Sequence, residues 1–353
     1  MATNAGVGCW VAIRRECDGD PLPDDQRAGV DPFCVRRCPG RRQDRSMKVD
    51  FSSGGMAYDV GGTVGAVQTQ AWGLASESDR LTDVLLVSPD HLTPVPCCSV
   101  TREKLRGGHC TDTTAAGLQH AALIEALCAA GVRVQTVEGS AGLPDMVYAR
   151  DAGLMTPWGY LPLAPGAAHR RREAVVLAAH IRSLGIPVLP QVSAGTIEGG
   201  DISVFRDGLV LIGCSGDRTD EGGAREVAEL FERHGWRAIV YRFDAHFLHL
   251  DTQFSALSGD QALACIDVLD DGFLAALAGE GIDLLPVSYK AARRLGCNVL
   301  ALGDGRILAA KGAGLTGTLP AEGYRITELE LDEFTSCGGG VHCLTLPLAR
   351  QTP

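Results

Sequence analysis

The 353-residue chain lacks an excess of positive charge, because 32 Lys and Arg face 43 Asp and Glu for a formal net charge of −11. Basic side chains supply most of the affinity of nucleic-acid-binding surfaces, so this balance argues against a nucleic-acid partner. No apolar run reaches the roughly 18 residues that a membrane helix needs, which argues against membrane insertion. The first residues also lack the basic start and apolar core of a secretory signal, so we expect none.

Aromatic residues make up only 5% of the chain, and its 13 cysteines have no regular spacing. Cys97 and Cys98 are adjacent, whereas Cys34 and Cys38 lie four residues apart with no paired histidine or second cysteine pair nearby. Structural zinc sites require such pairs, so the spacing predicts no metal. Scattered reduced thiols are typical of cytoplasmic proteins, and we expect this location.

The first 46 residues mix charged residues with proline, glycine and four cysteines, and they show neither helical nor strand periodicity. Such composition is typical of poorly ordered segments. We therefore predict a leader over residues 1–80, with Met47 or Met56 as alternative native starts, and one catalytic domain over residues 81–353.

From residue 83 onward the same unit recurs: a helical stretch ends in glycine and a strand follows at once. These glycines lie at intervals of 54, 50, 46 and 42 residues, at Gly131, Gly185, Gly235, Gly281 and Gly323. Glycine commonly follows the last residue of a helix. Apolar residues at i, i+3 and i+4 predict the helices themselves. The four clearest span residues 114–130, 171–184, 224–234 and 272–280.

A hairpin-like segment separates each strand from the next helix, with Asp-Gly turns at Asp207-Gly208 and Asp304-Gly305. The last such segment starts at Cys343 and has no following partner, so residues 83–88 would complete it and close a ring. Repeats of about 50 residues are typical of radial architectures. We therefore favour short sheets around a narrow central channel over an open doubly wound α/β sheet.

Polar residues interrupt the apolar strands where these meet the hairpins. The interruptions are Arg150-Asp151, Glu198-Gly199-Gly200-Asp201, His249-Leu250-Asp251 and Gly338-Gly339-Gly340-Val341-His342-Cys343. Equivalent positions of a closed ring converge on its axis, so we expect these side chains to face one pocket. A thiol, a histidine and several carboxylates are suited to nucleophilic attack on a cationic carbon centre.

In this order, the motifs Glu-Gly-Gly-Asp, His-Leu-Asp-Thr and Gly-Gly-Gly-Val-His-Cys resemble those of the guanidine-modifying enzymes of the pentein superfamily. That superfamily includes arginine deiminases, dimethylarginine dimethylaminohydrolases and amidinotransferases. The resemblance extends from residue 83 to about residue 350. It implies an α/β fold, a five-bladed αβ propeller of pseudo-fivefold ββαβ-like units around a central channel. It also implies a small guanidino compound as the partner and no cofactor.

The resemblance assigns chemical roles to five of these residues. Cys343 would attack the guanidinium carbon and form a covalent thiouronium. His249 would protonate the leaving amine and then activate water. Glu198 and Asp151 would hold the planar cation through paired charge-assisted hydrogen bonds, with Asp251 as a third acidic contact.

Other residues receive supporting roles. Arg218 matches the arginine that binds the substrate α-carboxylate in this family, and Arg170 or Arg172 would be a second. For Asp201 we expect a structural role in the Gly-Gly turn. The His342 side chain should point away from the pocket, because neighbouring residues of a strand alternate between its faces.

Three features favour the dimethylarginine hydrolases within the family. Asp145 and Tyr148 resemble an acid and an aromatic residue that contact the substrate there. Gly338 stands where deiminases carry an arginine, and only 62 residues separate Ser88 from Arg150, too few for the helical bundle of deiminases. We therefore predict a cysteine hydrolase that converts arginine or Nω-methylated arginine to citrulline and an amine. Arginine deiminase and amidinotransferase, in that order, are the alternatives.

Two other classes of protein, non-catalytic propellers and metal-dependent hydrolases, fit the sequence less well. A non-catalytic propeller, such as the ribosome anti-association factor, would lack the nucleophile and its histidine. A metal-dependent hydrolase would need a second histidine at ligand spacing. Residues 89–109 are the predicted lid, with Gly107-Gly108 as its hinge, and a homodimer is the expected assembly.

Overall fold

The computed structural model describes residues 72–352. Its strands are β1 (Arg80–Val87), β2 (Arg133–Val137), β3 (Gly153–Thr156), β4 (Gly159–Pro162), β5 (Ile202–Arg206), β6 (Leu209–Cys214), β7 (Arg237–Arg242), β8 (Phe254–Ala256), β9 (Gln261–Ala264), β10 (Asp283–Pro286), β11 (Leu300–Gly303), β12 (Arg306–Ala310), β13 (Arg325–Leu329) and β14 (Leu346–Gln351). Its α-helices are α1 (Ser99–Arg106), α2 (Thr113–Ala129), α3 (Arg171–Ser183), α4 (Glu221–Arg233), α5 (Asp271–Gly279), α6 (Tyr289–Ala292), α7 (Thr318–Ala321), α8 (Asp332–Ser336) and α9 (Val341–Leu344). None of the helices in this part of the chain is long and apolar enough to cross a bilayer.

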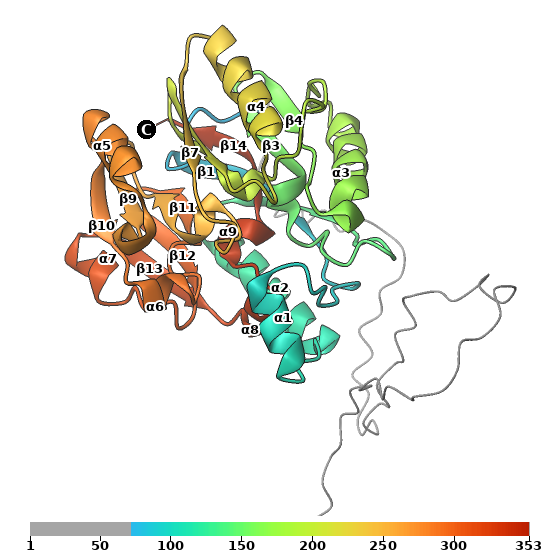
Figure 1. Cartoon of the computed structure of the whole chain (residues 1–353). Helices are drawn as coiled ribbons and strands as arrows, with labels where there is room; N and C mark the ends of the chain where they lie inside the picture. Colours follow the sequence, from blue (N-terminus) through green and yellow to red (C-terminus); the bar gives the residue numbers. More distant parts are fainter. Residues whose placement is uncertain (1–71, 353) are drawn as a thin grey trace, which may run out of the picture. The chain divides into compact units, whose positions relative to one another are not determined.

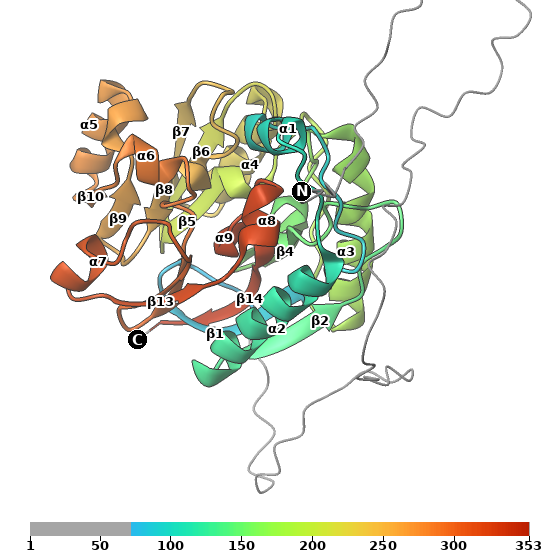
Figure 2. The same ribbon diagram turned by 90° about the horizontal axis from the view of Figure 1, so that it is seen from below.

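The strands form five small sheets, in the orders β14-β1-β2, β3-β4, β5-β6-β7, β8-β9-β10 and β11-β12-β13. Each three-stranded sheet combines an antiparallel pair with a third strand that runs parallel to the middle one. The repeated hairpin, helix and strand unit is therefore confirmed. Figure 1 follows the units from blue to red along the chain, and in Figure 2 the sheets lie around α9.

The two ends of the domain share one sheet. Strand β1 pairs antiparallel with β14, with Leu85 opposite Leu346, and parallel with β2. The strand predicted over residues 83–88 does complete the last hairpin, as the repeat required. This pairing brings the C-terminal unit, which contains Cys343, against the first unit of the domain.

The second unit departs from the plan, because its predicted third strand after Gly185 is reduced to a single bridge between Tyr160 and Val188. Around this bridge the Tyr160 N–H donates to the Pro187 carbonyl at 2.8 Å, and the Leu189 N–H donates to the Tyr160 carbonyl at 2.8 Å. Pro187 has no N–H to donate to a longer ladder. This missing donor explains why the sheet keeps only two strands.

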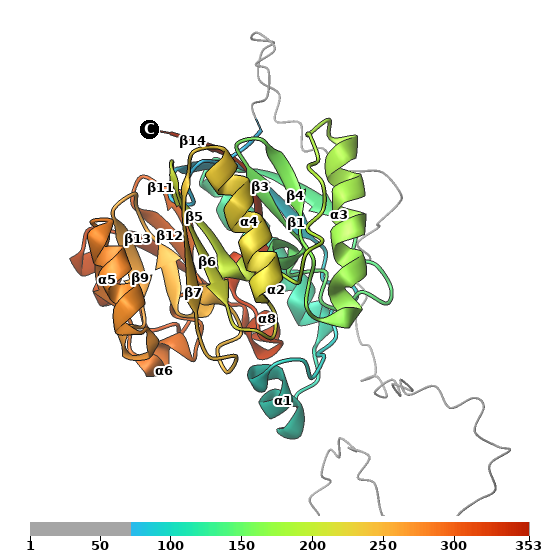
Figure 3. The same cartoon turned by 45° about the horizontal axis from the view of Figure 1, so that its top comes forward.

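The helices end where the glycines predicted. Gly131, Gly185, Gly235, Gly281 and Gly323 all have positive φ, between 69° and 86°. Only glycine adopts this left-handed conformation without a steric cost, which is why it stops a helix and releases the chain toward a strand. In Figure 3, α3, α4 and α5 lie at the outside of the molecule, each beside its own sheet.

The predicted leader boundary at residue 80 is wrong for the residues next to it. Leu74, Ser76 and Glu77 are buried, and the Gly73 N–H donates to the Leu348 carbonyl at 3.0 Å. Residues 72–80 therefore belong to the folded domain. The rest of the predicted leader, with Met47 and Met56, lies outside the described residues.

Candidate active site

Short helical turns carry the polar residues at the start of the hairpins. They are η2 (Ala149–Ala152), η4 (Gly199–Asp201) and η5 (Leu250–Thr252), together with α9 before β14. The sequence predicted a strand at Cys343, whereas the structure places this residue in the turn of α9. A tight turn lets the chain present several polar groups to one point before it enters the apolar strand.

Side chains of one turn hold the backbone of the next. Asp151 accepts from the Gly200 N–H at 3.0 Å, and Asp201 accepts from the Leu250 N–H at 2.8 Å. In both cases the carboxylate of one unit accepts from the residue that precedes the corresponding aspartate of the next unit, Asp201 or Asp251. Asp201 therefore fixes the turn that follows His249.

Asn298 makes the same connection in the last unit, where its Oδ1 accepts from the His342 N–H at 3.1 Å. The sequence analysis did not single out this residue. Its signal was spacing, because Asp151, Asp201, Asp251, Asn298 and Cys343 follow one another at 50, 50, 47 and 45 residues. An asparagine stands where three units carry aspartate, and it has an N–H to donate.

A cavity opens onto these turns. Its lining residues are Cys97, Cys98, Asp145, Tyr148, Asp151, Arg170, Arg218, Leu248, His249, Cys337, Gly338, Gly339 and Cys343. Seven of the nine predicted site residues are on this wall. Glu198 and Asp251 lie behind it and contact residues that line it. The structure therefore brings all nine predicted residues together at one site.

Cys343 is buried, and its sulfur accepts a hydrogen bond from Asn298 Nδ2 at 3.1 Å. The Asp251 carboxylate lies 3.5 Å from the sulfur. Burial, followed by the charges of Asp251 and Asp151, holds the pKa of the thiol well above its ordinary value, and the Asn298 amide opposes this rise. A cation that enters beside these carboxylates would favour the thiolate form of Cys343.

His249 is enclosed by carboxylates. Its Nε2 lies 2.8 Å from Glu198 Oε2, and its Nδ1 lies 3.7 Å from Asp151 Oδ1. Burial alone would lower the pKa of this imidazole, but Asp151, Glu198 and Asp201 outweigh it and raise the pKa to about 10. This raised pKa favours the protonated imidazole at neutral pH, a form that can donate a proton.

Glu198 is fully buried and accepts from Arg218 Nη1 at 2.9 Å as well as contacting His249. Burial raises the pKa of this carboxyl, but the His249 hydrogen bond and the charges of Arg218 and Arg170 outweigh burial and hold the pKa well below the usual range. Its other oxygen accepts from the Ala167 N–H at 3.3 Å. The sequence predicted a direct grip on the guanidinium. The structure instead places Glu198 behind His249 and Arg218, where it orients both.

His342 does not line the cavity, as predicted. Its Nδ1 lies 2.8 Å from Asp251 Oδ2, the same oxygen that Cys343 approaches, and its Nε2 contacts the Arg150 guanidinium. The predicted reason was wrong, because His342 and Cys343 lie in the turn of α9 and not on a strand. The pKa of Asp251 lies below its ordinary value, because the His342 hydrogen bond and nearby positive charges outweigh burial. Its Oδ1 is buried and has no partner among the described residues.

Arg170 lies on the cavity wall, but its donors are already occupied. Nη1 donates to Asp151 at 2.6 Å, Nε donates to Glu173 at 2.9 Å, and Nη2 donates to the carbonyls of Tyr148 and Asp145 at 2.9 and 3.1 Å. The sequence predicted that Arg170 would bind a substrate carboxylate, but its guanidinium has these other partners instead. Its bonds fix the loop that carries the predicted substrate contacts. Arg172, the alternative, is exposed.

Arg218 and the predicted lid meet at the cavity. The Arg218 guanidinium lines the cavity, and its Nη2 donates to the Cys97 carbonyl at 3.1 Å. Cys97 and Cys98 of the predicted lid line the same cavity, and α1 begins next to them at Ser99. The segment thus lies against the site, and Arg218 ties it there.

The triple glycine makes room for two of these side chains. A Cβ atom on Gly339 would lie 2.2 Å from the Tyr148 ring, and one on Gly340 would lie 2.5 Å from Asn298 Oδ1. Real Cβ atoms do not approach so closely, so these positions require glycine. Tyr148 is fixed in turn by a hydrogen bond from its hydroxyl to the Phe334 carbonyl at 2.9 Å.

Asn298 is therefore a positioning residue for the nucleophile, and its replacement tests this. We expect Asn298→Ala to lower kcat about 10- to 100-fold with little change in KM, because the sulfur loses the hydrogen bond from the Asn298 amide. Asn298→Asp keeps the acceptor for His342 but loses the donor and adds negative charge. Alkylation rates against pH should show the apparent pKa of Cys343 rising in both variants, and more in Asn298→Asp. An unchanged alkylation profile in Asn298→Asp would contradict the role.

The chain resembles known proteins over most of this domain. Residues 102–350 match a family model described as N,N dimethylarginine dimethylhydrolase, eukaryotic. The uncharacterized protein YkgA of Bacillus subtilis is 29% identical over 276 residues, which cover 78% of this chain and 94% of that protein. The N(G),N(G)-dimethylarginine dimethylaminohydrolase of Pseudomonas aeruginosa is 27% identical over 230 residues, covering 65% of this chain and 86% of that enzyme.

Solved structures agree with these matches. A dimethylarginine dimethylaminohydrolase from Pseudomonas aeruginosa, a cysteine-to-serine mutant complexed with citrulline, superimposes with a TM-score of 0.62 at 25% identity, over 76% of this chain and 99% of that one. The N-terminal domain of ArgZ, a cyanobacterial arginine dihydrolase, gives a TM-score of 0.66 at 22% identity, over 76% and 98% of the two chains, and shares the fold. The fold is thus that of the penteins, as the sequence predicted. The chain belongs to the family of N,N-dimethylarginine dimethylhydrolases.

Proposed function

We propose that the protein hydrolyses Nω-methylated arginine to citrulline and a methylated amine, with Cys343 as nucleophile. The observation that carries this proposal is one arrangement of groups. A buried thiol and a buried imidazolium line the same cavity, with carboxylates beside both. These are the groups that an attack on a guanidinium carbon needs.

Charge complementarity supports a cationic, planar substrate. Asp145 and Asp151 line the cavity, and Asp251 lies behind the nucleophile with one buried oxygen that no described residue contacts. A guanidinium that reaches these carboxylates offers them paired N–H donors. Its positive charge also offsets the effects that keep Cys343 protonated. Substrate binding and activation of the nucleophile are thereby coupled.

The reaction proceeds in two halves. The Cys343 thiol loses its proton to solvent when the guanidinium binds, and the thiolate forms a bond to the guanidinium carbon. The His249 imidazolium protonates the methylated nitrogen, and the C–N bond breaks to release the amine and leave a thiouronium. His249, now neutral, removes a proton from water as the water attacks the same carbon. The S–C bond then breaks with its electron pair on sulfur, the new hydroxyl proton passes to that sulfur, and citrulline and the free enzyme with its thiol remain.

A substrate panel tests the proposal. Purified protein is incubated separately with asymmetric dimethylarginine, monomethylarginine and arginine, and citrulline is measured. We expect kcat/KM for the methylated substrates to exceed that for arginine at least about 10-fold, since methyl groups that fill an apolar space contribute about 1–3 kcal/mol to discrimination. Faster turnover of arginine would assign a deiminase. Transfer of the amidino group to an added amine, without citrulline, would assign an amidinotransferase.

Two further expectations stay predictions. A homodimer is expected from the sequence, and light scattering on the purified protein measures it directly. Cytoplasmic location is expected from the scattered cysteines.

A further inference from the structure

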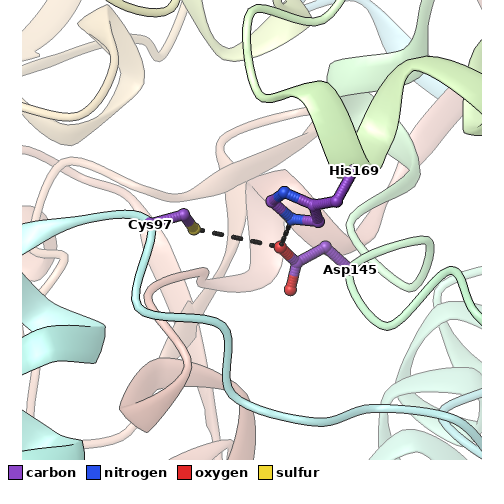
Figure 4. Close-up of side chains that lie close together, drawn as sticks. All are labelled: Cys97, Asp145 and His169. Carbon is purple, nitrogen blue, oxygen red and sulfur yellow. Dashed lines mark hydrogen bonds and ion pairs between the residues drawn. The ribbon is translucent and has the colours of Figure 1, made fainter. Parts of the chain in front are cut away.

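Three side chains with metal-binding atoms meet beside the active-site cavity (Figure 4). Cys97 precedes α1, Asp145 lies in the loop between β2 and η2, and His169 belongs to the short helix η3 (Ala168–Arg170). His169 Nε2 lies 2.6 Å from Asp145 Oδ2, and Cys97 Sγ lies 3.9 Å from the same oxygen. All three ligand atoms lie within 4.8 Å of one another.

This donor set suits zinc. Zinc binds thiolate sulfur at about 2.3 Å and imidazole nitrogen or carboxylate oxygen at about 2.0–2.2 Å, in a tetrahedron. Ligand atoms of such a tetrahedron lie about 3.3–3.6 Å apart, by the geometry of those bond lengths. The sulfur–oxygen separation of 3.9 Å is slightly longer than these values, and the nitrogen–oxygen separation of 2.6 Å is shorter. Small movements of the three side chains would bring these pairs to the distances of a zinc site.

The cluster is also accessible to a cation. The His169 side chain is 29% exposed, Cys97 is partly exposed, and Asp145 is buried. Cys97 and Asp145 line the active-site cavity. An ion held here would have three protein ligands and a fourth coordination position open to water, unlike a structural zinc site with four protein ligands.

We propose that Cys97, Asp145 and His169 bind a zinc ion at the rim of the active-site cavity. The bound ion takes the Asp145 carboxylate away from the substrate, so zinc competes with the substrate. This second consequence rests on the proposed function, whereas zinc binding does not. The sequence predicted no metal, because 48 and 24 residues separate the three ligands and none belongs to a recognisable metal motif.

Zinc binding displaces the proton of the Cys97 thiol to solvent, because a metal-bound cysteine is a thiolate. With one thiolate and one carboxylate, the two charges of the ion are balanced.

The experiment uses the full chain with Cys343→Ser, so that the nucleophile cannot bind the metal. Cobalt(II) is added as a spectroscopic probe, and zinc is then added to displace it. We expect a thiolate-to-cobalt charge-transfer band that disappears in Cys343→Ser/Cys97→Ser, and a zinc affinity at least about 100-fold weaker in that variant and in Cys343→Ser/His169→Gln. Cys128→Ser, which removes an exposed thiol on α2, is the matched control and should leave the band unchanged.

Two outcomes would overturn the site. A band that persists in both double variants would place the metal elsewhere, and loss of zinc binding in Cys343→Ser alone would place it on the nucleophile. Inhibition is measured separately in the wild type, where zinc should raise KM for the methylated substrate and His169→Gln should weaken that effect at least about 10-fold. If zinc binds the three residues but does not raise KM, its proposed competition with the substrate would be refuted and the zinc site itself would stand. Failure of the substrate panel would leave the cobalt result unaffected.

Discussion

Replacement of Cys343 by serine should lower kcat by roughly 10⁴-fold or more, the loss expected when the nucleophile of a covalent mechanism is removed. A serine hydroxyl stays protonated where the thiol ionises beside a bound cation. The substitution is nearly isosteric, so the free energy of unfolding should change by less than about 1.5 kcal/mol. Citrulline release measures the activity. Mass spectrometry of acid-quenched wild type should detect the thiouronium adduct, and the variant should show none.

Cys265→Ser is the matched control for this experiment. Cys265 is as buried as Cys343 but packs in a separate core cluster and does not line the cavity. It should keep wild-type kcat, so any general effect of replacing a buried thiol is measured independently. Cys343→Ser that keeps more than about one per cent of wild-type kcat would rule out the proposed nucleophile.

Glu198→Gln should lower both activity and stability. The carboxylate contacts Arg218 at 2.9 Å and His249 at 2.8 Å, and no water reaches it. Removing one partner of a buried ionic cluster leaves charges uncompensated, which costs about 3–5 kcal/mol. Without this acceptor the pKa of His249 falls and its ring loses its orientation, so kcat should fall about 10²- to 10⁴-fold. Urea unfolding and citrulline release measure the two effects.

The stability loss should depend on pH in a defined way. The pKa of His249 is raised to about 10 in the folded state, so its contribution is complete below its ordinary value of 6.5 and is lost as the pH rises toward 10. The pKa of Glu198 is lowered, so its contribution disappears in acid, below the ordinary value of 4.5. The difference in unfolding free energy between wild type and Glu198→Gln should therefore shrink on both sides of this range.

Asp83→Asn separates stability from activity. Asp83 is a buried carboxylate that binds the Arg133 guanidinium through two hydrogen bonds, and it does not line the cavity. Its loss should destabilise the protein and leave kcat near the wild-type value. If Glu198→Gln behaved in the same way, with normal kcat, its role in orienting His249 would be refuted.

Much of the fold could be read from local patterns. A glycine with positive φ is required wherever a helix must stop and release a strand, so Gly131, Gly185, Gly235, Gly281 and Gly323 marked every unit. Asp-Gly turns marked hairpins such as β5–β6 and β11–β12. Two predictions about the fold were wrong for local reasons. Pro187 has no N–H to donate, so the second sheet lacks its predicted third strand. The helical turn at Cys343 is too short to show an apolar period, so a strand was predicted there.

The site was predictable only as a set of residues. Cys343, His249 and Glu198 stand out because polar groups at the ends of apolar strands have a cost that a function must offset. The sequence could not tell which partner each group takes. Arg170 is occupied by Asp151, and the sulfur of Cys343 is contacted by both Asn298 and Asp251.

The sequence by itself determined the repeated unit, its strand that returns from the front of the domain, and the chemical groups of the site. The repeated unit and the chemical groups depend on backbone conformation or side-chain type within a few residues, and the returning strand follows from the number of repeats. Only the tertiary structure decided that Glu198 lies behind His249, that His342 shares the Asp251 carboxylate with Cys343, and that Cys97, Asp145 and His169 meet. Such contacts join residues tens of positions apart, and their distances are fixed by the packing of five units against one another.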